Sequence, residues 1–276
     1  IGWEGNREEL DEALAKQRID FLIGNALTTV AFKKNYGTSH LLTLVHNRVH
    51  SPEQSIGSAI VTRIDNNLSQ WAQLKDEKLV SSDPQAFGGF QIFAATMATK
   101  GINAYRDIPQ LRFIGFPQQK LLQMLLSGEA DVAILPSCVL ENAQERGLIP
   151  ANKLKVVLKQ PHPDFACEVS TQLYPGYALT KLGHTDHKLA TKVVTSLLQI
   201  PPESQAAVQG RYQYWSAPVD DSPVFELLKQ LEQWPFVTNW QRLLHNALPW
   251  GASFIFALLL GYIHHLRVKR LVVKRT

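Results

Sequence analysis

The sequence predicts an α/β protein of two lobes, each a mainly parallel β-sheet with flanking helices, followed by one C-terminal transmembrane helix. Three observations support this prediction. Short apolar runs alternate with helical patterns over residues 8–158, which is typical of βαβ units. The alternation stops after Pro163, and the later segments suit a return to the first lobe. An uncharged apolar stretch and a basic cluster end the chain.

Each lobe takes its elements from particular parts of the chain. We expect lobe 1 to comprise about residues 1–60 and 170–232, and lobe 2 about residues 64–165, with crossings near 56–63 and 165–177. The expected strands are 19–23, 41–45, 58–62, 79–82, 111–116, 130–135, 154–158 and 174–182. The expected helices are 8–18, 68–75, 87–99, 118–127, 137–146, 188–198, 202–208 and 224–231.

The end of the chain predicts a membrane anchor. Residues 247–266 contain no Lys, Arg, Asp or Glu, and about twenty apolar residues in a helix span a bilayer core. The basic tail 267–276 indicates the cytoplasmic side, which places residues 1–232 and a membrane-proximal segment, 233–246, outside. A buried C-terminal helix is the alternative. Because an external domain needs an export signal and the chain starts at Ile1, we expect a mature or cut form in the inner membrane of a Gram-negative bacterium.

Composition excludes several classes of protein. With 45% apolar and 19% charged residues, the chain is neither disordered nor of low complexity. The net charge of +4 comes from 28 basic and 24 acidic residues, and five of the bases lie in the last ten residues. Residues 1–266 therefore carry 23 bases and 24 acids, a charge of −1, so we expect no nucleic-acid partner.

No motif in the sequence indicates catalysis. The chain lacks a G-x-S-x-G elbow, a P-loop and a G-x-G-x-x-G turn, which makes a small hydrolase an unfavoured interpretation. His46 and His50 are spaced four residues apart, but an extended chain separates them by roughly 13 Å, too far for one metal ion. We therefore expect no catalytic residue, no metal and no cofactor.

Three strand-to-helix junctions predict a binding site instead. Helix N-termini at the carboxyl ends of strands favour anions, and hydroxyl groups and close-approaching glycines add donors. The alternative is that these polar residues, Ser82 and Ser137 among them, only cap their helices. Phe87 either lines the cleft or packs its helix. The candidate ligand-binding residues are Thr28, Thr29, Ser82, Phe87, Gly88, Gly89, Ser137 and Cys138.

Parts of the sequence resemble the phosphonate-type, PhnD-like periplasmic binding family. The resemblance covers about residues 8–230 and is carried by the segments 79–90, 125–141 and 147–149, with L-x-G-x-A-D-V at 126–132 as its most specific part. It implies a type II bilobal fold that binds oxyanions between its lobes. We expect this chain to lack the first strand of that family.

With a transmembrane helix after the domain, the arrangement is similar to the histidine kinases that sense tetrathionate or thiosulfate. The resemblance implies a sensing portion that binds a small sulfur oxyanion, forms a homodimer and reaches a response regulator only through a kinase region. No kinase motif follows here, since His265-Leu-Arg-Val is not a phosphoacceptor pattern. The alternative is a membrane-tethered binding component of a phosphonate or oxyanion importer.

Cys138 adds a chemical hypothesis to this resemblance. If Ser137 caps the helix, the Cys138 thiol lies in the first turn, where the helix dipole can lower its pKa from about 8.5. A thiolate could then contact, and react with, the central S–S bond of tetrathionate. A buried structural cysteine and a disulfide between Cys138 and Cys167 are the alternatives.

Overall fold

The computed structural model describes residues 7–49 and 51–233, and the described residues up to Leu231 form one compact unit. Within these described residues no helix is long and apolar enough to cross a membrane. The predicted transmembrane helix at 247–266 and the basic tail at 267–276 lie outside the described part of the chain, as does all but one residue of the segment 233–246.

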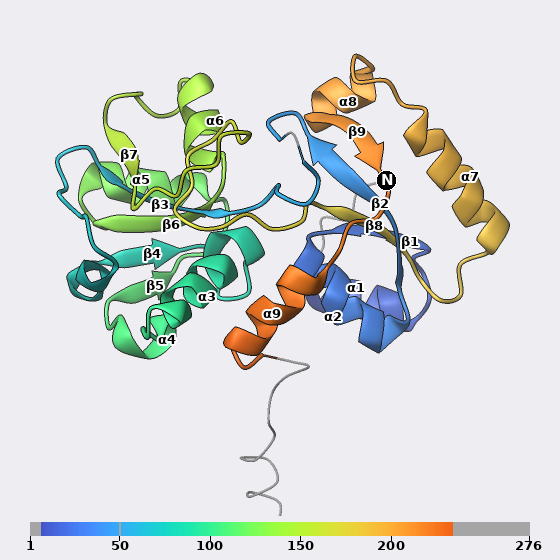
Figure 1. Ribbon diagram of the computed structural model, residues 1–276, viewed down its shortest axis with the longest axis horizontal. Helices are drawn as coiled ribbons and strands as arrows, with labels where there is room; N and C mark the ends of the chain where they lie inside the picture. The colour runs from blue at the N-terminus through green and yellow to red at the C-terminus, as the bar shows by residue number, and fades with distance from the viewer. Residues whose placement is uncertain (1–6, 50, 234–276) are drawn as a thin grey trace, which may run out of the picture. The chain divides into compact units, whose positions relative to one another are not determined.

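Lobe 1 is built on a four-stranded sheet with the order β1-β8-β2-β9 (Figure 1). Its strands are β1 (Phe21–Gly24), β2 (Ser39–His46), β8 (Ala178–Lys181) and β9 (Tyr212–Ser216). Its helices are α1 (Arg7–Ala15), α2 (Ala26–Tyr36), α7 (His187–Leu198) and α8 (Gln205–Gly210). Helix α2 begins where Asn25 accepts a hydrogen bond from the Thr28 backbone and ends at Gly37, whose φ of 63° suits glycine.

Lobe 2 is built on a five-stranded sheet with the order β5-β4-β6-β3-β7. Its strands are β3 (Ser58–Arg63), β4 (Leu79–Ser81), β5 (Leu111–Phe113), β6 (Val132–Pro136) and β7 (Leu154–Val157). Its helices are α3 (Ile92–Thr99), α4 (Ala104–Asp107), α5 (Gln119–Ser127) and α6 (Val139–Glu145), with a 3₁₀ helix at Trp71–Asp76 and a π-helical turn at Phe87–Gln91.

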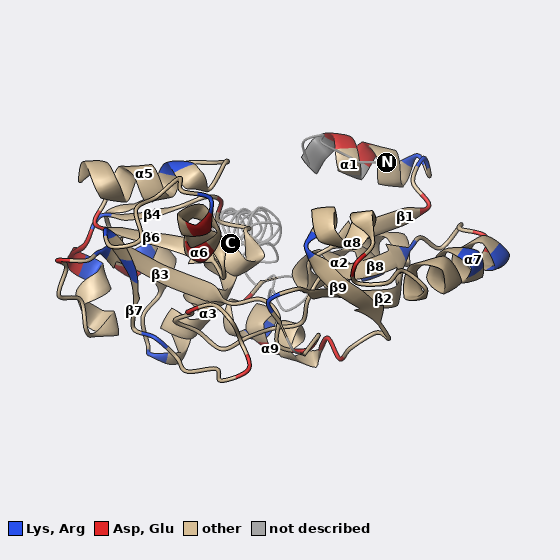
Figure 2. Ribbon diagram, turned by 90° about the horizontal axis from the view of Figure 1, so that it is seen from above, with Lys and Arg blue, Asp and Glu red and all other residues tan. Residues whose placement is uncertain are grey.

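Both faces of the lobe 2 sheet are covered by helices. Alternate residues of β3 point to opposite faces, so Ala59 and Val61 join one buried cluster and Ile60 joins the other. The first cluster includes apolar residues of α5 and α6, and the second includes those of α3 and α4. Figure 2 shows α5 and α3 on opposite sides of β4 and β6.

The prediction of mainly parallel sheets is wrong for neighbouring strands. All three described pairings in lobe 1 are antiparallel, and lobe 2 has two parallel and two antiparallel pairings. For four of these five antiparallel pairings, all except that of β2 with β9, the physical reason lies in the strands next to the two crossings. Strand β8 enters between β1 and β2, and β3 enters between β6 and β7, each running opposite to its two neighbours. The neighbours themselves remain mutually parallel, as helical crossovers require.

Two connecting segments, 47–57 and 158–177, join the lobes. They run antiparallel and are paired at two isolated bridges, Val49 with Phe165 and Ile56 with Tyr174. The backbone N–H of Tyr174 donates to the Ile56 carbonyl at 2.8 Å, and the Ile56 N–H donates back at 3.0 Å. The crossings therefore lie side by side.

Helix α9 (Ser222–Gln230) follows lobe 1 in the chain but contacts both lobes. It packs against α2 of lobe 1 and α3 of lobe 2. Its buried residues Val224 and Leu227 share one apolar cluster with Ala26 of α2 and with Phe87 and Ile92 of lobe 2. This cluster forms an apolar connection between the lobes.

Candidate functional site

The carboxyl ends of several strands place the candidate residues. Strand β1 ends next to Asn25 in lobe 1, and β2 ends at His46. In lobe 2, β4 is followed by Ser82 and β6 by Ser137. Ligands of open α/β lobes bind beyond such strand ends.

The glycine turn of lobe 2 is packed against the protein's own chain. A Cβ atom at Gly88 would lie 3.0 Å from the Ile56 side chain and 3.2 Å from Pro136, and one at Gly89 would lie 3.2 Å from the Ser82 hydroxyl. Ser58 donates its hydroxyl hydrogen to the Gly88 carbonyl at 2.6 Å. The small size of these glycines thus permits close packing in the described conformation.

Ser82 and Ser137 lie in the same packed group. The Ser137 hydroxyl accepts a hydrogen bond from the Gly57 N–H at 3.3 Å, and the Ser137 N–H donates to the Gly57 carbonyl at 2.9 Å. The Ser82 hydroxyl is buried without a hydrogen-bond partner among the described residues. Neither serine supplies a side-chain helix cap, since the N-cap of α6 is Cys138 and that of the turn after β4 is Ala86.

The two lobe 1 candidates, Thr28 and Thr29, form hydrogen bonds with Asn25 at the start of their own helix. The Thr28 hydroxyl donates to the Asn25 side chain at 3.2 Å, and the Thr29 hydroxyl donates to the Asn25 backbone carbonyl at 3.1 Å. Phe87 is 2% exposed and makes an edge-to-face contact with Tyr174 at 5.7 Å between ring centroids. Phe87 is therefore a packing residue that joins the turn of lobe 2 to the crossing segment, and the ligand role of the two threonines remains a prediction.

The hypothesis of a reactive Cys138 thiolate is wrong for this structure. Cys138 forms a disulfide with Cys167, and their Cα atoms are 5.2 Å apart. The described part of the chain holds no free cysteine. A bonded sulfur has no thiol to ionise, so the helix dipole has no thiolate to stabilise. The disulfide instead attaches the start of α6 to the returning crossing segment.

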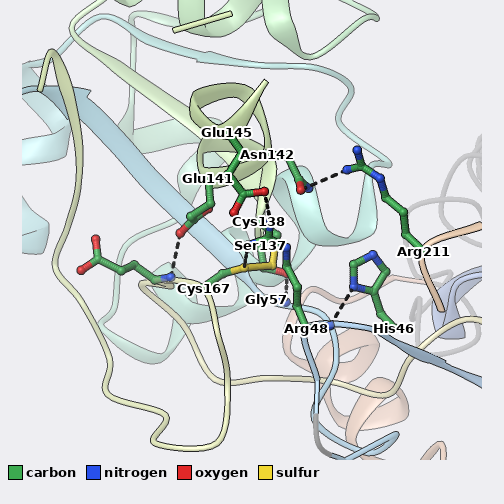
Figure 3. Close-up of a disulfide and its surroundings, with 11 residues drawn as sticks. His46, Arg48, Gly57, Ser137, Cys138, Glu141, Asn142, Glu145, Cys167 and Arg211 are labelled. Atoms are coloured by element: carbon green, nitrogen blue, oxygen red, sulfur yellow. Dashed lines mark hydrogen bonds and ion pairs between the residues drawn. A yellow bond between two sulfur atoms is a disulfide. The ribbon is translucent and has the colours of Figure 1, made fainter. Parts of the chain in front are cut away.

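A basic cluster that the sequence analysis missed lies beside this disulfide. It comprises His46, Arg48 and Arg211, and Figure 3 shows the His46 ring between the two arginines in that view. Arg211 donates to the Asn142 side chain of α6 at 3.1 Å, and Arg48 forms an ion pair with Glu145 of the same helix. Lobe 1 and its crossing segment are thus bonded to lobe 2 through two guanidinium groups.

Burial sets the charge state of this cluster. It lowers the pKa of His46, and the positive charges of Arg48 and Arg211 lower that pKa further. His46 is therefore neutral near pH 7, when both arginines are charged. The Arg48 side chain is only 19% exposed, whereas that of Glu145 is 60% exposed. A partly buried guanidinium beside a second one is suited to bind an oxyanion.

Two sheets joined by two crossings, with donors at the facing strand ends, define a two-lobed solute-binding protein. Residues 4–222 match the family described as the periplasmic substrate-binding proteins of phosphonate ABC transporters, and the chain belongs to this family.

One curated relative has a different role from an importer. The chain is 30% identical over 264 residues to the tetrathionate sensor histidine kinase TtrS of Salmonella typhimurium strain LT2. The alignment covers 92% of this chain and 43% of that kinase, so the chain spans less than half of its length.

Solved structures share the fold at low sequence identity. A binding protein of a phosphonate ABC transporter from Pseudomonas aeruginosa has a TM-score of 0.63 at 13% identity, covering 82% of this chain and 73% of its own. PhnD1 from Prochlorococcus marinus, solved with methylphosphonate, has a TM-score of 0.62 at 14% identity, covering 83% and 84%. These likenesses establish the α/β periplasmic-binding-protein fold.

Proposed function

We propose that this chain is the periplasmic sensing portion of a two-component histidine kinase and binds a small sulfur oxyanion, tetrathionate or thiosulfate, between its lobes. The observation that carries this proposal is the basic cluster of His46, Arg48 and Arg211, whose two arginines are bonded to α6 of lobe 2. The similarity to a tetrathionate sensor spans both lobes and supports the same ligand class.

An oxyanion would bind where guanidinium groups are held ready. Arg48 and Arg211 offer fork-shaped sets of donors, and Asn142 adds an amide. Glu145 is the more exposed partner of Arg48, so a ligand can replace this carboxylate without burying it unpaired. In the proposal Ser82, Gly88, Gly89 and Ser137 form the lobe 2 side of the site, and Thr28 and Thr29 the lobe 1 side.

The proposal also assigns each segment of the chain a location relative to the inner membrane. Residues 1–232 form the periplasmic domain, 233–246 the membrane-proximal segment, 247–266 a single span of the inner membrane and 267–276 the cytoplasmic tail. Two copies form a dimer, and a response regulator is reached through a kinase region outside this chain. A ligand can shift the lobes from one relative arrangement to another only if it binds the second arrangement more tightly than the first.

The proposal is tested by calorimetry on the 276-residue chain in detergent, titrated with tetrathionate, thiosulfate, methylphosphonate and sulfate. We expect binding heat with at least one of the two sulfur oxyanions. Arg48→Gln should weaken that binding by about tenfold or more, the scale of one lost charge-assisted hydrogen bond. Arg112→Gln serves as control, because Arg112 is exposed and pairs with Glu129. Absence of heat with both sulfur oxyanions would contradict the proposal.

A second candidate function follows from the family. Importer components of this family bind phosphonates, and the structure of PhnD1 contains methylphosphonate. A membrane-tethered binding component of a phosphonate or oxyanion importer would give heat with methylphosphonate and none with tetrathionate. The same titration therefore separates the two candidates.

A further inference from the structure

A small hollow lies at the margin of the basic cluster, where Arg211 meets α5 and α6. Its volume is about 140 Å³, and its polar lining consists of Arg146, Arg211, Gln118, Gln119 and Asn142. Roughly four to five waters, at about 30 Å³ each, would fill it. This space is large enough for a tetrahedral oxyanion group.

The polar groups around this hollow are donors or amides, with no acid. None of its lining residues is Asp or Glu. The guanidinium of Arg146 makes no hydrogen bond or ion pair among residues 7–49 and 51–233, and the nearby Glu145 is paired with Arg48. Two arginines without a carboxylate between them leave a local positive charge that favours an anion.

The hollow takes its charges from both lobes. Arg211 follows α8 of lobe 1 and has left-handed backbone angles, whereas Arg146 follows α6 of lobe 2. Arg211 donates a hydrogen bond at 3.1 Å to Asn142 of α6, and both residues line the hollow. An anion bound to both arginines would therefore bridge the lobes.

We propose that Arg146 and Arg211 form a second anion subsite, which binds the far end of a linear ligand that carries an anionic group at each end. This inference rests on the proposed function, in which Arg48 binds the first end. Arg48 pairs with Glu145 and Arg211 bonds to Asn142, about one helical turn away on α6, so the two subsites adjoin one another. A ligand with one sulfonate group fills a single subsite, and a bis-sulfonate such as tetrathionate fills both.

The test compares the affinities of Arg146→Gln, wild type and Arg112→Gln for tetrathionate and thiosulfate, each in the full 276-residue chain. Arg112 is a matched control, since it is an exposed arginine of the same lobe that pairs with Glu129. We expect Arg146→Gln to weaken tetrathionate binding by about tenfold and to change thiosulfate binding by less than about twofold. Arg146→Lys should recover part of the loss, because it retains the charge but not the fork of donors.

The outcomes separate this inference from the function on which it rests. If wild type binds tetrathionate and Arg146→Gln binds it equally well, the second subsite is refuted and the proposed function stands. Equal losses for tetrathionate and thiosulfate, or wild-type binding of thiosulfate alone, also refute a two-ended ligand. If wild type binds neither sulfur oxyanion, the proposed function fails first. Unchanged thermal unfolding of the variant excludes misfolding as the cause of a loss.

Discussion

The two lobes differ in how completely their sheets are buried. In lobe 2, β3 and β6 are buried along their whole length except for their last residues. In lobe 1, β1 has no buried residue and β9 has one, Trp215. Two large apolar clusters fill lobe 2, whereas the lobe 1 clusters around Phe32 and Leu42 each contain three buried residues.

This difference indicates how each lobe supports its part of the candidate binding site. The packed turn with Ser82, Gly88 and Ser137 belongs to the deeply buried lobe, where apolar burial on two faces holds the backbone in place. His46 and Arg211 belong to the less buried lobe, and Arg211 reaches α6 through its side chain. We therefore expect lobe 2 to be the more stable part and the charged contacts of lobe 1 to be the more adjustable part.

The largest expected effect comes from paired truncations of one phenylalanine in each lobe. Phe93 is fully buried between Phe90 and Trp71, whereas Phe32 is 4% exposed in a small cluster. Phe93→Ala should lower the free energy of unfolding by about 4–5 kcal/mol and Phe32→Ala by about 3 kcal/mol or less, because the larger core leaves the larger cavity. Urea denaturation measures both, and equal losses would contradict the comparison.

The next effect concerns the disulfide at the lobe 2 side of the crossing. It closes a separation of 29 residues, for which loop-closure entropy predicts a stabilisation of about 3–4 kcal/mol. The double variant Cys138→Ser/Cys167→Ser should lose this amount in urea denaturation. Wild type treated with a reducing agent should lose the same amount, and the double variant should not respond to that agent. A response of the double variant would show that the agent acts elsewhere.

The smallest expected effect concerns the less buried lobe alone. Burial, with the charges of Arg48 and Arg211, lowers the folded-state pKa of His46 below its unfolded value of about 6.5. Between these two pKa values the unfolded chain binds more protons, so stability rises with pH there. The stabilisation is complete above about pH 6.5 and is lost as the pH falls toward the folded pKa. His46→Gln should flatten this part of the stability profile, and an unchanged slope would refute the assignment.

Local patterns in the sequence predicted most elements of the fold. The helix expected over 118–127 is α5, Gln119–Ser127, and it ends at Gly128 with a φ of 79°. The strand expected over 58–62 is β3, Ser58–Arg63. Strand β9 was not predicted, because Tyr212–Ser216 follows a helix directly and has no alternation of buried and exposed residues. Strand direction was predicted wrongly because it depends on which strand returns from the other lobe.

The candidate site was only partly predictable for a related reason. Turn residues such as Gly88 and Ser137 are visible in the sequence, and the structure brings them together through Gly57 and Pro136. The pairing of Arg48 with Glu145 spans 97 positions, and no local pattern indicates it. The sequence offered a disulfide between Cys138 and Cys167 as one alternative but could not select it, since a Cα separation is a property of the fold.

Helix α9 has a mechanical consequence. A rigid rod that rests on two bodies cannot stay fixed to both when those bodies rotate against each other. Since α9 is seated on α2 and on α3, such a rotation forces it to slide over at least one of them. The direction in which the polypeptide leaves Gln230 must then tilt relative to that body.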